Sequence, residues 1–275
     1  MRVSVWRLRN YRYVKIAAAA SLAAMVVFLL DAPAEGRNGG TWAGYLIGCA
    51  AAALTVWLGW YGIRKRRYGQ GTVPLEEVLS AHISLGVAAM VLATLHTGFE
   101  FGFNFHLLSY AFLLVISVSG LCGVLLYAYV PAAMTVNAGG RSLTDMMEEI
   151  AEINREARRI GAELDDDINR LIRRSVQYTV VGGTVWQLLT GRYTDRHTEV
   201  ALEGIQSRAE SFSALEAEAG RRLVTLLARK IEALGRFRRH IRYKAWMDIW
   251  LYVHVPLSFA YAAALIGHVA FVMYY

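Results

Sequence analysis

Five apolar segments, each long enough to cross a lipid bilayer, constrain the fold of this 275-residue chain more than any other feature. A spanning α-helix needs about 20 mostly apolar residues, and helices satisfy their own backbone hydrogen bonds in lipid. We predict an all-α membrane protein with five transmembrane helices. The first segment also resembles a secretory signal, but its apolar run is long for a signal, so we expect it to be retained as a span. The five predicted spans are residues 14–30, 42–63, 79–99, 107–130 and 247–274.

The placement of basic residues predicts the orientation of the chain in the membrane. Arginine and lysine cluster before the first span (Arg2, Arg7, Arg9), in the connection at residues 64–77, and in the charged segment after the fourth span, whereas the other connections contain only Arg37. Cytoplasmic connections carry an excess of these residues. We therefore expect a bacterial inner-membrane protein with a cytoplasmic N-terminus and a periplasmic C-terminus. Attraction to anionic lipid explains the basic composition, so no nucleic-acid partner is expected.

The charged residues 137–244 predict a cytoplasmic helical hairpin inserted between the fourth and fifth spans. Ser142 or Thr144 is the expected cap of its first helix. The Gly182-Gly183 pair predicts a break, formed by a hairpin turn, a short strand pair or a membrane-surface contact. After this break the second helix runs directly into the fifth span. Apolar residues recur at three- and four-residue steps in both helices, as in coiled coils: Leu143, Met146, Ile150, Ile153, Ala157, Ile160, Leu164, Ile168 and Leu171 in the first, and Phe212, Leu215, Leu223, Leu226, Leu227, Ile231, Leu234, Phe237 and Ile241 in the second.

These patterns divide the chain into three parts. Residues 1–136 are expected to form the first four transmembrane helices, 137–244 the cytoplasmic insertion, and 245–275 the fifth helix, which completes the bundle. Two roles remain open for the insertion: docking of a redox partner or partner subunit, and simple packing on itself to stabilise the fifth helix.

Four histidines lie in two of the predicted spans with the same separation. His82 and His96 are fourteen residues apart in the third span, and so are His254 and His268 in the fifth. Fourteen residues on an α-helix make a rise of roughly 21 Å and just under four turns, so both members of a pair face the same way at two depths. Polar groups at membrane depth are costly and usually functional. Ordinary packing explains any one of these residues, but the repeated spacing favours two bis-histidine sites.

Two bis-histidine sites at different depths are typical of two haems rather than of one metal ion. A haem takes one axial imidazole from each of two facing helices. By depth, His82 pairs with His254 and His96 pairs with His268. We therefore expect these four residues to bind the iron of two b-type haems, in a bundle formed by the five helices.

Glycines and cysteines bear on the same prediction. Gly86, Gly120 and Gly267 are expected to let a porphyrin approach the backbone, although close helix packing explains them equally well. The cysteines, Cys49 and Cys122, lie singly in apolar spans, and the sequence has no C-x-x-C-H motif. A covalent haem, an iron–sulfur centre and a cysteine zinc site are therefore not expected.

The two histidine segments, AHISLGVAAMVLATLHTG (81–98) and WLYVHVPLSFAYAAALIGHVAFVMYY (250–275), resemble the histidine helices of membrane di-haem b cytochromes. Ligands on the third and fifth spans are most similar to the ferric-reductase and NADPH-oxidase transmembrane domain. The general plan also resembles cytochrome b561-like proteins and quinol-oxidising subunits. The resemblance implies a four-helix haem-binding bundle, non-covalent haem b, electron transfer across the membrane, and the four histidines as axial ligands.

The chain departs from this family in ways that affect the expected partners. No sixth span and no flavin or nicotinamide domain follow, and no glycine-rich dinucleotide motif occurs. We therefore expect an electron-transfer subunit of a hetero-oligomeric oxidoreductase complex, working between a quinol or protein donor and another redox subunit. Whether the chain is an enzyme by itself is left open. The alternative is a membrane signalling or scaffold protein with a coiled-coil stalk.

Several further residues are candidates for supporting roles. His106 and Glu100 are candidates for proton transfer at a quinone pocket, or else ordinary interfacial polar groups. Arg67, Arg242 and Lys244 are candidates for neutralising haem propionates, although basic residues are expected at a cytoplasmic rim in any case.

Overall fold

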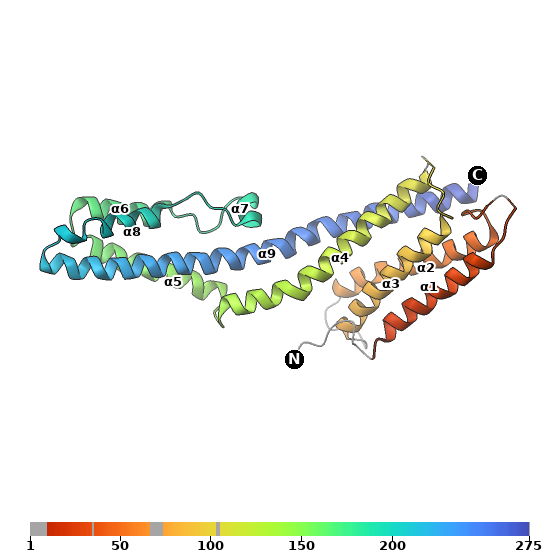
Figure 1. Ribbon diagram of the computed structural model, residues 1–275, viewed down its shortest axis with the longest axis horizontal. Coiled ribbons are helices and arrows are strands. Elements are labelled where there is room, and N and C mark those ends of the chain that lie inside the picture. The colour runs from red at the N-terminus through yellow and green to blue at the C-terminus, as the bar shows by residue number, and fades with distance from the viewer. Residues whose placement is uncertain (1–9, 35, 67–73, 103–104, 275) are drawn as a thin grey trace. The chain divides into compact units, whose positions relative to one another are not determined.

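The computed structural model describes residues 10–34, 36–66, 74–102 and 105–274, and the elements formed by these residues are all helices (Figure 1). The chain divides into two compact units. The histidine unit comprises Met1–Gly123 and Leu251–Tyr275, and the insertion unit comprises Val124–Trp250. The predicted all-α class is confirmed for the described residues. The basic residues Arg2, Arg7 and Arg9, the centre of the 64–77 connection and the C-terminal Tyr275 lie outside the described residues.

Five of the described helices are long and apolar enough to cross a membrane, which matches the predicted number of spans and supports a membrane protein. Much of their apolar surface is exposed: Leu22 and Leu30 of the first helix are 66% and 75% accessible. Lipid is the environment that suits such surfaces, since large exposed apolar patches are rare on soluble monomers. The five helices are α1 (Arg12–Leu30), α2 (Trp42–Arg66), α3 (Leu75–His96), α4 (Phe105–Ala138) and α9 (Ala214–Tyr274).

Helix α3 packs against both α1 and α2 in the histidine unit (Figure 1). The buried cluster between these helices contains Ala24, Ile47, Ala51, Leu92 and Leu95. Alanine at a helix contact lets the two backbones approach closely, which is a main source of packing energy between helices in lipid. His96 lies at the C-terminal end of α3, immediately after Leu95, and His82 lies in its N-terminal half.

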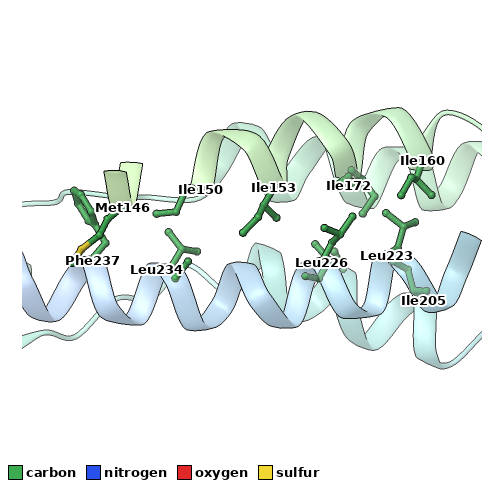
Figure 2. Packing of buried hydrophobic residues seen from close by; sticks show 14 of the residues in the cluster. Met146, Ile150, Ile153, Ile160, Ile172, Ile205, Leu223, Leu226, Leu234 and Phe237 are labelled. Carbon is green, nitrogen blue, oxygen red and sulfur yellow. The ribbon is translucent and has the colours of Figure 1, made fainter. Parts of the chain in front are cut away.

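The insertion unit is built around a long apolar core (Figure 2). Its side chains come from the last residue of α4, from α5 (Leu143–Gly161), α6 (Asp166–Tyr178) and α8 (His197–Gln206), and from the first half of α9. On α5 the buried residues follow the predicted steps of three and four, and they face buried leucines of α9. The core members are Ala138, Met146, Ile150, Ile153, Ala157, Ile160, Ile168, Ile172, Ala201, Ile205, Leu223, Leu226, Leu227, Ala233, Leu234 and Phe237.

The first predicted helix of the insertion begins where expected but is shorter. Ser142 is its cap: the Ser142 hydroxyl accepts a hydrogen bond from the Asp145 amide (3.1 Å), and the Asp145 carboxylate accepts one from the Ser142 amide (2.8 Å). The prediction of one continuous helix as far as Leu171 is wrong. The chain leaves α5 after Gly161, and Asp165 caps a second helix, α6, by accepting from the Ile168 amide at 2.7 Å. A strong N-cap residue inside the periodic stretch therefore decided the break.

The segment around Gly182-Gly183 interrupts the helices, as predicted. The short strand pair, one of the three predicted alternatives for this segment, does not form among its residues. Thr184 and Gln187 form a capping box that starts a short helix, α7 (Val185–Thr190), and Gly191 ends it with a positive φ of 68°. Helix α8 follows before the chain reaches α9. The insertion is therefore more elaborate than the predicted hairpin. The prediction that its last helix runs into the fifth span is confirmed, because α9 is continuous over 61 residues.

One buried position of α9 breaks the apolar pattern of this core. Leu227, Lys230 and Leu234 follow one another at helical steps, and the lysine is only 1% exposed. Its ammonium donates hydrogen bonds to the Ser175 carbonyl (2.7 Å) and the Ser175 hydroxyl (2.9 Å). The Ser175 hydroxyl lies 3.1 Å from that of Thr198, so a small polar network links α6, α8 and α9. Buried polar groups are tolerated when they are hydrogen-bonded in this way.

The core makes a prediction about Ile153, which is 2% exposed. Ile153→Ala should lower the free energy of opening of the insertion unit by about 2 to 5 kcal/mol, because it leaves a cavity between α5 and α9. Met147→Ala on the exposed side of α5 is the matched control, with an expected effect below about 0.5 kcal/mol. Hydrogen–deuterium exchange of α5 and α6 in the full chain measures both. Equal effects of the two substitutions would contradict the packing described.

The burial of Lys230 leads us to expect that the stability of the insertion unit depends on pH. Burial lowers its pKa from 10.5 to about 8, with a further lowering by Arg158 that Asp195 and Glu199 oppose. Between these two values the unfolded chain holds a proton that the folded chain has released, so the insertion unit should become more stable as pH rises from about 8 toward about 10. Lys230→Met should remove this rise. Exchange rates of α6 and α9 amides, corrected for their intrinsic pH dependence, provide the measurement; an unchanged slope in the variant would contradict the prediction.

Candidate functional site

The structure brings the four predicted histidines together in two pairs, all within the histidine unit. The imidazoles of His96 and His268 have ring centroids 5.9 Å apart and nearly perpendicular planes, at 82°. His82 and His254 are close enough to interact electrostatically. Each pair joins one residue of α3 to one of α9, and the pairs lie at different levels along both helices.

A hydrogen bond to a backbone carbonyl orients the imidazole of His96. Its Nδ1 atom lies 2.8 Å from the carbonyl oxygen of Gly44 on α2. Because a carbonyl can only accept, Nδ1 of the neutral ring must carry the hydrogen, and Nε2 is left with a free lone pair. This arrangement is common in metal-binding histidines, where a second residue holds the ring and selects the nitrogen that binds the metal.

Glycines on α2 and just before it leave room for the His96 ring. A Cβ atom at Gly48 would lie 2.7 Å from Nδ1 and 2.8 Å from Cε1 of that ring, and one at Gly39 would lie 3.1 Å from Cε1. Sequence reasoning missed these residues. The spacing of Gly44 and Gly48, four residues apart in an apolar helix, is the small-xxx-small signal of close helix approach and was available to find them.

His268 is held by a second histidine. Its Nδ1 lies 2.8 Å from Nδ1 of His106, at the start of α4, and the two rings meet edge to face with centroids 4.7 Å apart. One of these nitrogens must donate and the other accept. If His268 donates, its Nε2 is free, as in His96. His106, predicted for a quinone pocket together with Glu100, is thus placed against His268, whereas the Glu100 carboxylate lies near Gly36.

The second pair has different surroundings. Nδ1 of His254 lies 3.2 Å from the hydroxyl of Ser119 on α4. The ring of His82 lies against Tyr61, with centroids 4.8 Å apart and planes tilted by 37°. Nδ1 of His82 is buried without a hydrogen-bond partner of good geometry among the described residues, although the backbone of Leu58 interacts with this imidazole.

Hydrogen bonds from two neighbouring helices position the histidine helix α9. Thr55 on α2 bonds to Tyr261 on α9 at 3.2 Å. The Ser109 hydroxyl on α4 donates to the Ala264 carbonyl on α9 at 2.9 Å. Such contacts between spans are worth roughly 0.6 kcal/mol each on average, so they orient helices more than they hold them together. Helix α9 is thereby tied to α2 and α4 close to its histidines.

The three predicted glycines have different neighbours. A Cβ at Gly120 would lie 3.6 Å from Cε1 of His254, so this residue adjoins a histidine. A Cβ at Gly86 would meet only Leu58, at 4.0 Å, and one at Gly267 would lie 2.8 Å from the ring of Phe105. Close helix packing is therefore the simpler explanation of Gly267.

The residues predicted to neutralise propionates have other partners where they are described. Lys244 forms an ion pair with Asp248 at 2.7 Å, and the guanidinium of Arg242 lies 5.4 Å from the centre of the Trp246 ring. Both belong to the insertion unit. Arg67 lies outside the described residues.

The geometry of the His96 and His268 pair fits a shared metal ion. Metal–imidazole bonds are about 2 Å long, so two ring nitrogens about 4 Å apart can bind one metal. The 5.9 Å between ring centroids is compatible with that separation. The described residues contain no group of three or more His, Cys, Asp or Glu side chains arranged to hold a metal ion. The two imidazoles are the groups at this place that could act as ligands of one metal ion.

Comparisons with known proteins do not identify a family. No protein-family model matches the sequence, and neither the curated proteins nor the solved structures contain a match.

The close approach of Gly48 to His96 leads to a prediction. Gly48→Ala should displace the His96 ring and weaken its bond to the Gly44 carbonyl, because the added methyl group would overlap the imidazole. In ¹⁵N-histidine-labelled protein, the Nδ1 signal of His96 should shift. Gly59→Ala, in the same helix with nothing within 4 Å of the added carbon, should leave that signal in place. The same spectrum in both variants would show that Gly48 does not contact this histidine.

Proposed function

We propose that the protein is a membrane-embedded di-haem cytochrome b subunit that carries electrons across the membrane. One haem would be held by His82 and His254, and the other by His96 and His268. The observation that carries this proposal is the meeting of the paired histidines from α3 and α9, with Nδ1 of three of the four rings engaged by neighbouring groups. Ordinary packing histidines have no reason to share this arrangement at two levels.

The surrounding residues would perform the protein's part of the chemistry. A bound b-type haem would supply reversible one-electron transfer. The Gly44 carbonyl keeps the His96 ring in the tautomer that presents Nε2, and Ser119 orients His254. His106 would hold the ring of His268. The exposed apolar faces of the helices would exclude water from the site by contact with lipid.

The orientation and partners belong to the same proposal. The distribution of arginine and lysine supports a cytoplasmic N-terminus and insertion in a bacterial inner membrane. Electrons would pass between a quinol or protein donor and a partner redox subunit. The insertion unit, with its packed core, is a suitable docking element for that subunit.

The long continuous helix α9 favours one competing function. It joins residues of the insertion core to residues of the histidine unit without a break. A signalling or scaffold protein would use such a helix to carry a conformational change to a coiled-coil stalk, with or without a cofactor.

Haem content tests the proposal directly. The purified wild-type chain should contain two b-type haems per polypeptide, with the reduced-minus-oxidised bands of low-spin bis-histidine iron. His96→Ala or His268→Ala should each lose about half of the haem, because a lone axial imidazole would remain at that site. Combining His82→Ala with His96→Ala should remove both haems.

His197→Ala, which changes an exposed histidine of the insertion unit, is the matched control and should keep both haems. A folded wild-type chain without haem after expression with ample haem supply would contradict the proposal. The scaffold function would then be the better explanation, particularly if partner binding survived in the histidine variants.

A further inference from the structure

The insertion unit contains a basic pocket between the middle of α9 and the segment after α7. Its volume is about 270 Å³, and it is lined by Gly191, Tyr193, Gly235, Arg238, Arg239 and Arg242. The three arginines lie on one side of α9. Arg242 follows Arg238 by four residues and Arg239 by three, and both separations place side chains on the same face of a helix. The pocket lies wholly within the insertion unit.

The charges of these arginines are balanced only in part. Arg238 forms a two-pronged ion pair with Asp195, at 3.0 and 2.8 Å, and also donates to the Val180 carbonyl. Arg239 donates its Nε hydrogen to Asn137, which is neutral. Neither Arg239 nor Arg242 forms an ion pair with an acidic side chain among the described residues. Two positive charges beside one pocket therefore have no ion-pair partner among the described residues.

Two of the lining side chains also have donors that lack partners. Nε of Arg242 and the hydroxyl of Tyr193 are buried and make no hydrogen bond among the described residues. Tyrosine is protonated at neutral pH, and burial raises the pKa of Tyr193 further, so its hydroxyl is a donor there. Unsatisfied buried donors destabilise the fold, so they favour a bound acceptor.

Gly191 provides the space that Arg242 occupies. It ends α7 with φ of 68°, and a Cβ atom there would overlap Nη1 of Arg242. The turn after α7 and the arginines of α9 are therefore fitted to each other. A planar guanidinium with free N–H groups matches the oxygens of a phosphate group better than a point charge does.

The residues next to the pocket are of the types found near a membrane surface. Arg242 lies about one and a half turns before the apolar segment that begins at Met247. Trp246 donates its indole hydrogen to the Leu189 carbonyl of α7 at 3.0 Å, and Trp186 on the same short helix is 69% exposed. Tryptophan is enriched where membrane proteins meet the lipid headgroups.

We infer that this pocket binds a phosphate group, held by Arg239 and Arg242 with the Tyr193 hydroxyl as a further donor. Anionic phospholipid headgroups and soluble phosphate compounds share this chemistry. The inference does not depend on haem binding, because every residue that it uses lies in the insertion unit. It assigns a role to Arg242 other than the neutralisation of propionates.

Calorimetric titration of the full chain in detergent tests the inference with three probes: inorganic phosphate, short-chain phosphatidylglycerol and short-chain phosphatidylcholine. Arg242→Gln and Arg239→Gln should each weaken binding about tenfold or more, as expected for loss of a charge-assisted contact. Arg221→Gln is the control for net charge, because it removes one exposed arginine elsewhere on α9.

Gly191→Ala separates geometry from charge. It should abolish binding by displacing Arg242 while the net charge stays the same. Gly139→Ala is its matched control, since Gly139 also has a positive φ, of 56°, but nothing within 4 Å of the added carbon. Gly139→Ala should bind like the wild type.

The three probes distinguish the sources of the ligand. Binding of phosphatidylglycerol alone identifies a lipid headgroup site, and binding of inorganic phosphate shows that soluble phosphates are accepted. Either result supports the inference if the binding is lost in Arg242→Gln. Binding that is absent for both anions, or that Arg221→Gln weakens as much as Arg242→Gln does, would overturn it. Tight binding of phosphatidylcholine that survives in Arg242→Gln would also overturn it.

Discussion

Helix α9 must meet two different physical requirements along one unbroken backbone, and both compact units depend on it. Its first half presents leucines at steps of three and four to α5, α6 and α8, and so buries the core of the insertion unit. Its second half carries exposed apolar side chains together with His254 and His268. A continuous helix satisfies its backbone hydrogen bonds in either environment, and therefore only its side chains have to change at the boundary. The same chain segment thus supports the insertion core, the phosphate pocket and the paired histidines.

The histidines are surrounded by groups that limit how their rings can turn. A carbonyl of α2 holds His96, a hydroxyl of α4 faces His254, and His106 contacts His268. An unpaired imidazole in an apolar environment carries a cost that such contacts reduce. These contacts come from α2 and α4, so the helices without predicted ligands also contribute to the geometry of the site.

The parts of the fold that follow from local rules could be predicted from the sequence. The apolar segments, the cap at Ser142 and the continuity of α9 depend on residues close together in the chain, and the structure has all three. The break at Asp165 and helix α8 were missed. The apolar period continues across Asp165, and its capping bond to Ile168 decides the outcome only because α6 then packs its own face into the same core. The burial of Lys230 likewise depends on a residue far away in the chain, because its ammonium donates to Ser175, 55 residues away.

The candidate site divides in the same way. The residue types, their fourteen-residue spacing and their membrane depth are properties of the sequence, because helical geometry converts spacing into direction and height. The pairing of the histidines by depth was expected from the sequence, whereas the nitrogen of each ring that is engaged and the contacts of Gly48 and His106 with these rings were decided by the tertiary structure. Those features depend on contacts between helices that are far apart in the chain, and no periodicity within one helix contains information about what its neighbour presents.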